Sequence, residues 1–242
     1  MESNQFADVL GKKSVAEQLK RALPASYEAA ESFWQSAQQA PALSPRMKAL
    51  VQVALHATVT SLDREETQRR IRHALAVGAT AQDVLDVLLT IVGVANHALY
   101  FAVPVLMREL EAAGHADAGL PPMTPDAQKA KEAFVQARGF WNEQRDLIVR
   151  LMPEYFSALS RLSAEPWKNG SLTDKERELV CIAIDCTVTH MYEPGLAMHI
   201  RHALRKGARR DEILEVFHLA ALTGLDGYIV GAQTLYGEPA PR

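Results

Sequence analysis

The chain has few cysteines and no dense cluster of basic residues, and both absences narrow its possible functions. Only two of its 242 residues are cysteine, Cys181 and Cys186. On one helix they would lie roughly 140° apart around the axis and about 7.5 Å apart along it, which does not suit a disulfide. Lysine and arginine total 26 against 29 acidic residues, for a formal net charge of -3. We therefore expect no nucleic acid partner.

Targeting and membrane signals are also lacking. The N-terminus has no basic segment followed by an apolar stretch, so we expect no secretory signal and a cytoplasmic location. Residues 87–107 and 216–236 are apolar enough to raise the question of a membrane span. Polar residues interrupt both stretches, among them Asn96, His97 and Asp226, and such groups are rare in lipid. We expect a pair of buried helices and no membrane partner.

The chain repeats itself at a displacement of 129 residues. Residues 71–75 and 200–204 share the sequence Ile-Arg-His-Ala-Leu, and in both copies Gly-Ala follows after two more residues. The repeat covers residues 11–113 and 140–242 without a gap and predicts a duplicated helical unit. The predicted divisions are a first unit at residues 1–113, a linker at 114–125 and a second unit at 126–242. Positions where only one copy keeps a polar residue are the candidates for chemistry.

Helical periodicity dominates both copies, and strand signals are negligible. Thr173 with Glu176 three residues later forms a capping-box pattern and predicts a helix from 174 to about 189. Pro194 suits the first turn of the next helix, and Gly207 suits its C-terminal cap. The sequence therefore predicts an all-α architecture of antiparallel helix hairpins. Further helices are expected at 211–222 and 225–236, with shorter amphipathic pieces at 25–38 and 154–162.

Three polar residues of the second copy have no similar counterpart in the first: Glu178 stands opposite Ala49, His199 opposite Arg70 and Glu193 opposite Arg64. If the two hairpin helices cross near Glu178 and His199, the carboxylate could orient the imidazole for acid–base work. Asp185 follows Glu178 by seven residues and lies on the same helix face. The alternative is that both acids are solvated and His199 is a hydrogen-bonded core residue.

Other polar residues allow two interpretations each. Arg201 could clamp a carboxylate or form a structural ion pair, and it recurs in the first copy as Arg72. Tyr192 could line a pocket or belong to the core. His190 lies close in sequence to Glu193, His199 and His202, but their spacing matches no known metal motif, so we expect no metal. Gly-rich phosphate loops are absent, so we expect no nucleotide cofactor.

These residues carry a family resemblance. Residues 178–180, 193–204 and Gly207, with the helix start at Asp211, resemble the carboxymuconolactone decarboxylase family, which shares the helical fold of alkylhydroperoxidase D. The first copy resembles it through residues 71–75 and 78–80. The resemblance therefore implies a tandem duplication of an alkylhydroperoxidase D-like unit. It also implies a homo-oligomer, either a trimer imitating the hexamer of one-unit members or a dimer.

The resemblance bears on function through the residues before His199. Peroxidase members of this fold carry C-x-x-C with a histidine four residues after the second cysteine, and here Tyr192 and Gly195 occupy those positions. Decarboxylase-like members have a Glu-Pro run, as at Glu193, and the match places Glu178, Glu193 and His199 in the pocket. The interval from Glu178 to His199 is two residues longer than expected of the small decarboxylases, which reshapes the turn.

The resemblance thus implies proton-transfer chemistry, without a cofactor, on a small carboxylated or lactone-like substrate, with decarboxylation in aromatic-compound breakdown as one example. The expected roles are His199 as acid–base, Glu178 as its orienting group, Glu193 or Asp185 as a second polarising group, Arg201 as a carboxylate clamp, and Tyr192 and His190 as substrate-binding residues. Two alternatives stay open: a redox protein of peroxidase type that lacks C-x-x-C, and a non-catalytic ligand-binding or scaffold protein.

Overall fold

A computed structural model describes residues 6–237, and this part of the chain is helical without strands. The first copy contributes α1 (Phe6–Val9), α2 (Lys13–Ala22), α3 (Pro24–Gln38), α4 (Pro45–Ala57), α5 (Arg64–Ala76), α6 (Ala81–Thr90), the 3₁₀ helix η1 (Ile91–Asn96) and α7 (His97–Ala112). Between the copies lie η2 (Ala116–Ala118) and α8 (Pro125–Arg138). The second copy contributes α9 (Glu143–Leu151), α10 (Pro153–Asn169), α11 (Asp174–Asp185), α12 (Glu193–Arg205), α13 (Arg210–Ala221), η3 (Leu222–Leu225) and α14 (Asp226–Tyr236).

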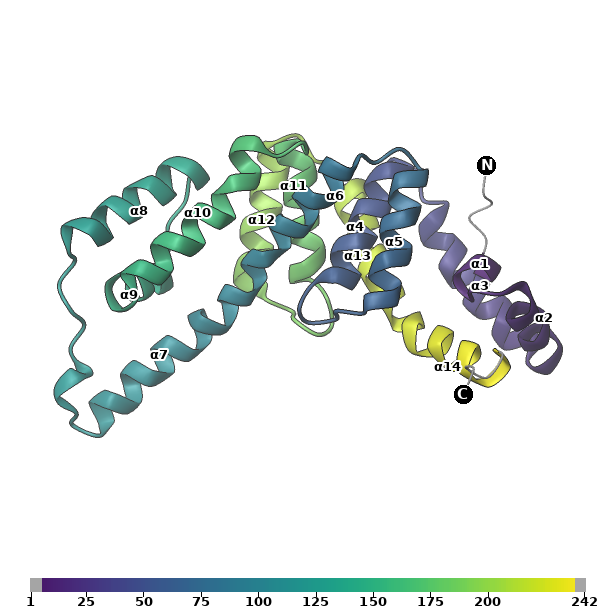
Figure 1. The fold of residues 1–242 in the computed structure, drawn as a ribbon, viewed down its shortest axis with the longest axis horizontal. Coiled ribbons are helices and arrows are strands. Elements are labelled where there is room, and N and C mark those ends of the chain that lie inside the picture. Colours follow the sequence, from purple (N-terminus) through teal and green to yellow (C-terminus); the bar gives the residue numbers. More distant parts are fainter. Residues whose placement is uncertain (1–5, 238–242) are drawn as a thin grey trace.

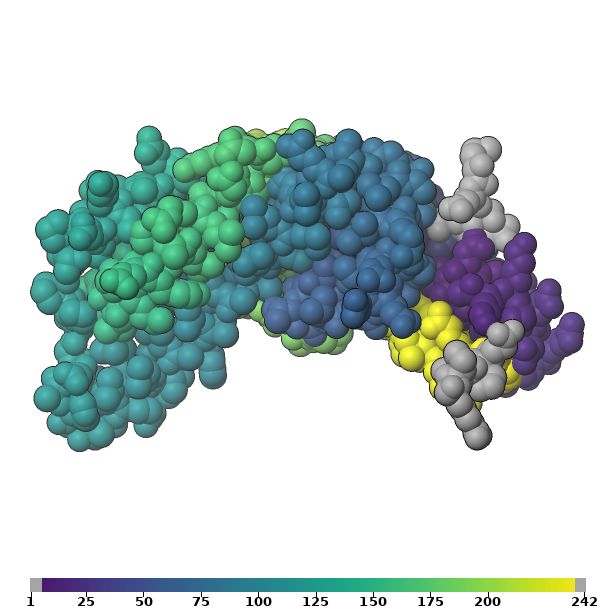
Figure 2. Space-filling model, in the orientation of Figure 1, coloured from purple at the N-terminus to yellow at the C-terminus, as the bar shows by residue number. Residues whose placement is uncertain are grey.

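The two copies form one central bundle and exchange their outer helices. The hairpins α4–α5 and α11–α12 meet where α11 packs against α4. Helices α2 and α3 of the first copy pack against α13, η3 and α14 of the second. In the same way, α9 and α10 pack against α6, η1 and α7 (Figure 1). The copies lie in direct contact along the middle of an elongated molecule (Figure 2), so neither buries its core alone.

Most predicted helix ends are confirmed, but α11 is shorter than predicted, and α10 continues to Asn169 rather than ending near 162. Thr173 and Glu176 form the capping box at the start of α11, and Gly207 has a positive φ of 84° just after α12. However, α11 ends at Asp185 rather than near 189. The hydroxyl of Thr187 donates to the carbonyl of Ile184 at 3.1 Å, which gives the backbone an alternative to another helical turn. The residues freed from the helix form the turn that carries His190.

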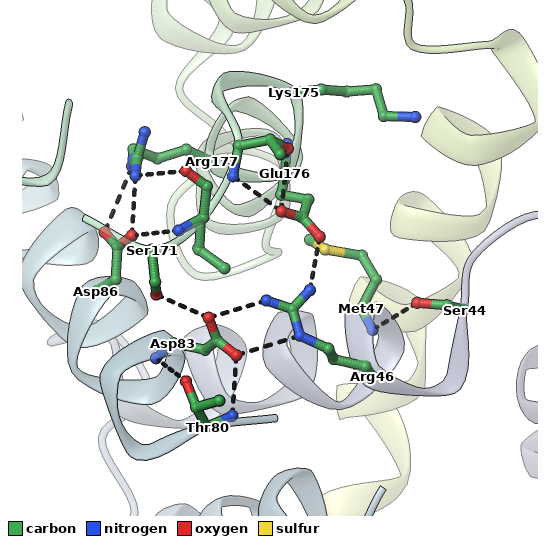
Figure 3. Close-up of polar contacts among 12 residues, drawn as sticks. Ser44, Arg46, Met47, Thr80, Asp83, Asp86, Ser171, Lys175, Glu176 and Arg177 are labelled. Atoms are coloured by element: carbon green, nitrogen blue, oxygen red, sulfur yellow. Dashed lines mark hydrogen bonds and ion pairs between the residues drawn. The ribbon is translucent and has the colours of Figure 1, made fainter. Parts of the chain in front are cut away.

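Buried ion pairs join the copies in a pattern that the duplication repeats. Arg177 of α11 binds Asp86 of α6 at 2.8 Å (Figure 3). A displacement of 129 residues converts this pair into Lys48 and Glu215, which bind at 3.1 Å. Asp86 also accepts from the backbone N–H of Leu172, and Glu215 accepts from the equivalent N–H of Leu43. The repeated contacts support a tandem duplication with approximate twofold symmetry.

These pairs also bear on two stretches that are long and apolar enough to cross a membrane, Ala81–Ala112 and Arg210–Tyr236. Each stretch is a helix pair interrupted by a 3₁₀ turn. Asp86 and Glu215 lie on these stretches and bind cations of the other copy. A charged pair inside lipid is costly, so we interpret both stretches as core helices of a soluble protein.

The Arg177–Asp86 pair gives a stability prediction. Its side chains are only 2% and 1% exposed. Removal of Asp86 leaves the buried charge of Arg177 with only the carbonyl of Leu172 and the more distant carboxylate of Asp174, at a cost of about 3–5 kcal/mol. We expect Asp86→Ala to lower the free energy of unfolding by that amount in urea denaturation. Lys206 and Asp174 form a 2.6 Å pair that is 53% and 44% exposed, so Lys206→Ala should cost less than about 1 kcal/mol. Equal costs for the two variants would contradict this account.

Candidate active site

Glu178 and His199 meet between helices α11 and α12. Nδ1 of His199 lies 2.5 Å from Oε2 of Glu178, and both residues are buried. The other oxygen, Oε1, lies 3.4 Å from Nδ1 of His202, one turn further along α12. Residues 178 and 199 lie 21 positions apart, and the antiparallel hairpin brings them together. The structure therefore places in contact two of the three polar residues that only the second copy possesses.

The ionisation of Glu178 sets the orientation of the imidazole. Burial acts to raise the pKa of Glu178, but the hydrogen bond to His199 and the charges of His199, His202 and Arg138 outweigh it and leave the pKa lowered. An ionised carboxylate only accepts hydrogen bonds, so Nδ1 of His199 carries a proton and donates it. The second ring nitrogen, Nε2, is left for chemistry.

His199 borders a cavity of about 80 Å³, which we call the inner hollow. A buried water needs roughly 10–15 Å³ of such volume, so the hollow has room for several water-sized groups and suits a small molecule. Helices α7, α8, α9 and α10 contribute much of its wall. The lining residues that matter below are His97, Arg138, Arg145, Trp167, Asp185 and His199.

Two arginines on the wall of the inner hollow have no carboxylate partner within the part of the chain that the structure describes. The guanidinium of Arg138 lies 3.3 Å from the ring centroid of Trp167 and donates to the carbonyl of Ser163. That of Arg145 lies 4.5 Å from the ring centroid of Phe140. Burial lowers the pKa of Arg138 to about 10, and both side chains stay charged at neutral pH. They are available to an anionic ligand.

Asp185 lies between the Glu178–His199 pair and two histidines that border a second hollow. Its Oδ2 is 4.0 Å from Nε2 of His199 and has no hydrogen-bond partner. Burial raises the pKa of Asp185 to about 8. Its Oδ1 is 3.7 Å from His97 and from His190. Together with Tyr192, these histidines border an outer hollow of about 500 Å³.

The remaining predicted site residues lie elsewhere. Glu193 begins α12 and is exposed, and it does not line the inner hollow. Arg201 is exposed on α12 and is likewise not part of the lining. The structure therefore brings together Glu178, His199 and Asp185, places Tyr192 and His190 at the outer hollow, and leaves Glu193 and Arg201 at the surface. A direct carboxylate clamp by Arg201 does not fit this placement.

The sequence reasoning missed Arg138, Arg145 and His97. Arg145 corresponds to Ala16 in the first copy, so the contrast between copies could have identified it. Arg138 precedes the repeated region and has no counterpart to compare. His97 corresponds to Asp226, which is also ionisable, and the contrast between polar and apolar residues cannot detect such a pair.

The equivalent position in the first copy is filled. Arg70 replaces His199, is buried, and donates from Nη1 to Oε1 of Gln52 at 2.7 Å. Its Nε also lies 3.3 Å from Glu66. With Ala49 in place of Glu178, the first copy has neither the imidazole nor its carboxylate. The candidate chemistry is confined to the second copy.

The two thiols lack the setting of a redox pair. Burial raises the pKa of Cys181 well above its ordinary value and that of Cys186 to about 12. The nucleophilic form of cysteine is the thiolate, which this environment disfavours at neutral pH.

Comparison with known proteins identifies relatives by sequence and by structure. The model of the carboxymuconolactone decarboxylase family matches residues 153–229. A crystal structure of a candidate gamma-carboxymuconolactone decarboxylase subunit from Burkholderia xenovorans is 33% identical and superposes with a TM-score of 0.86. The match covers 95% of this chain and 92% of that one. A search of curated proteins finds no match.

Proposed function

The chain belongs to the carboxymuconolactone decarboxylase family, and we propose on this basis that it is a decarboxylase-like enzyme of acid–base chemistry. Its substrate would be a small carboxylated or lactone-like molecule, such as those formed in the breakdown of aromatic compounds. The observation that carries the proposal is the buried pair of Glu178 and His199 beside a hollow lined by two guanidinium groups that form no ion pair with a carboxylate in the described part of the chain.

Substrate binding would use the charge of the hollow. Arg138 and Arg145 line a space whose one acidic group among the described residues, Asp185, has a pKa raised to about 8 by burial and forms no ion pair with them, so an anionic substrate would supply the missing partner. Their aromatic neighbours hold each guanidinium in place and exclude water, which strengthens an ion pair. A carboxylate held there would lie close to His199, because all three residues line the same hollow.

The reaction would proceed by carbon–carbon cleavage and proton return. The bond to the carboxylate breaks, CO₂ leaves, and the electron pair moves onto a carbonyl oxygen conjugated with that carbon. The guanidinium charge stabilises the resulting enolate. Protonated His199 then delivers a proton from Nε2 to the carbon, and water returns it. One proton is consumed for each CO₂ released, and Glu178 keeps Nδ1 bound throughout.

The two alternative functions have weaker support. A peroxidase of this fold needs a reactive thiolate, and both thiols have raised pKa values. A scaffold protein has no use for a charged hollow, and two partly buried arginines that form no ion pair within the described part of the chain are costly. Both observations favour the enzyme.

A direct assay tests the proposal. Purified protein is incubated with gamma-carboxymuconolactone and with related unsaturated lactone acids and β-keto acids, and CO₂ release is measured. We expect turnover of at least one of them with a kcat on the order of 1–10³ s⁻¹, the usual range for enzymes. The double variant Glu178→Gln/His199→Gln serves as the control. Absence of CO₂ release with every compound, together with hydroperoxide turnover that depends on Cys181, would support the redox alternative instead.

A further inference from the structure

We propose that His97, Asp185 and His190 form a binding site for a divalent transition-metal ion such as Zn²⁺, placed between the inner and outer hollows. The three side chains come from different elements: His97 begins α7, Asp185 ends α11, and His190 lies in the turn before α12. Their candidate ligand atoms all lie within 4.8 Å of one another. Two imidazoles and one carboxylate are a donor set that such ions favour.

The three distances define where the ion would sit. Nδ1 of His97 is 2.7 Å from Nε2 of His190, and Oδ1 of Asp185 is 3.7 Å from each of these nitrogens. The point equidistant from the corners of a triangle with these sides lies about 2.0 Å from each corner, and Zn–N and Zn–O bonds are about 2.0–2.2 Å long. The distances to that point therefore match zinc bond lengths. Because the point lies in the plane of the three atoms, the two nitrogens, now 2.7 Å apart, would have to move apart to reach the tetrahedral geometry of a zinc site.

The rings would reorient on binding. They now lie nearly in one plane, with centroids 5.0 Å apart and an angle of 10° between them, so their nitrogens share one hydrogen bond. To bind an ion at the equidistant point, both nitrogen lone pairs must be directed at it. Each ring therefore has to rotate until its lone pair lies about 45° from the line that joins the two nitrogens. Both side chains are 15% exposed and border the outer hollow, which gives them room to turn.

The surroundings of Asp185 favour a role as a metal ligand over a role as a hydrogen-bonded core residue. Its side chain is 1% exposed, and its Oδ2 has no hydrogen-bond partner. A buried carboxylate is costly without a charged partner. Coordination through Oδ1 would supply one and would leave Oδ2 facing His199. With three protein ligands, the ion would keep an open position toward the hollows, as catalytic zinc sites do. The occupant of that position would be water or an anionic oxygen of a ligand.

The duplication shows that this donor set is complete in one place only. A displacement of 129 residues exchanges the roles of the first two donors: His56 replaces Asp185, and Asp226 replaces His97. These two form their own pair at 3.2 Å. The third donor, His190, corresponds to Ser61, so the equivalent position has lost one ligand. We expect a single ion per chain.

Another group of possible ligands fits less well. Glu178, Cys181 and His199 also lie within 4.8 Å of one another. A cysteine binds zinc as the thiolate, and burial holds the pKa of Cys181 far above neutrality. Glu178 and His199 already bind each other at 2.5 Å. This group remains the acid–base pair.

The site differs from the expectation drawn from sequence, which found no metal motif among His190, Glu193, His199 and His202. Two of the three proposed ligands, His97 and Asp185, were outside that group. His97 lies 93 residues before His190 and in the other copy, so spacing along the chain could not reveal the set.

Metal binding can be measured without any substrate, so the result is independent of the proposed decarboxylase activity. Untagged protein is treated with a chelator and titrated with Zn²⁺ by calorimetry and with Co²⁺ by visible absorption. We expect one equivalent per chain and d–d bands typical of nitrogen and oxygen ligands. His190→Gln and Asp185→Asn should each weaken binding by more than about 100-fold, beyond the 10–100-fold typical of losing a second-shell partner.

Two controls separate loss of a ligand from loss of the fold. His115 is an exposed histidine beyond α7 whose ring lies beside its near neighbour Asp117, and His115→Gln should bind the ion as tightly as the original protein. His190 lies in a partly exposed turn, so His190→Gln should keep the helical circular dichroism spectrum. Absence of stoichiometric binding to the original protein, or full binding by both His190→Gln and Asp185→Asn, would overturn the proposal.

Discussion

The variant His199→Gln is expected to lose about 10²–10⁴-fold in kcat for CO₂ release, the usual contribution of a general acid–base group. Glutamine keeps a polar side chain near Glu178 but cannot carry the transferred proton. The ring of His199 borders the hollow, and its Nδ1 is bound to Glu178, which leaves Nε2 for proton transfer. We therefore expect the loss in kcat. KM for the substrate should change by less than about threefold, since uniform binding is not removed.

His202 provides a matched comparison for this prediction. It lies on the same helix and reaches the same carboxylate, at 3.4 Å rather than 2.5 Å, but it does not line the inner hollow. His202→Gln should therefore lose no more than about tenfold, the equivalent of one ordinary hydrogen bond. If His202→Gln were as inactive as His199→Gln, or if His199→Gln kept full turnover, the assignment of the acid–base group would be wrong.

Much of the fold could be predicted because the signals lie close together in sequence. The capping box at Thr173 and the glycine at 207 each depend on a few neighbouring residues, and the structure has both. The end of α11 was misplaced because the helical spacing of apolar residues continues through Cys186 and the next helix breaker is Pro194, whereas the helix ends at Asp185. There, the competition between helix and turn is decided by side-chain hydrogen bonds such as that of Thr187.

The candidate site was only partly predictable for a different reason. Glu178 and His199 could be found because the first copy lacks both, and their helices are consecutive. The other walls of the hollow come from α7 and α8, outside the second hairpin. The two copies exchange their outer helices, and this exchange decides which helix packs against which copy. No local sequence pattern encodes it. Arg201 was considered as a clamp because it lies close to His199 in sequence, whereas Arg138 is distant from His199 in sequence and was not considered.

The arginines of the inner hollow give the second large effect. Arg145→Met is expected to raise KM for a carboxylated substrate by about 10–100-fold, because a hydrogen bond to a charged group contributes about 1.5–3 kcal/mol. Methionine is an unbranched apolar side chain that can fill the space beside Phe140, over which the guanidinium of Arg145 now lies, so the fold should persist. Lysine should restore binding only in part, since a point charge does not reproduce the planar fork of arginine.

Arg201→Met decides between the two candidate clamps. Arg201 is exposed and lies outside the lining of the inner hollow, so its removal should leave KM within about twofold, as most surface substitutions do. Steady-state kinetics of both variants with the same substrate, and with a neutral ester of it, make the comparison. The ester has no carboxylate to bind, so Arg145→Met should discriminate little against it. A rise in KM for Arg201→Met but not for Arg145→Met would show that the substrate binds on the outer face of α12, and the inner hollow would then not be the binding site.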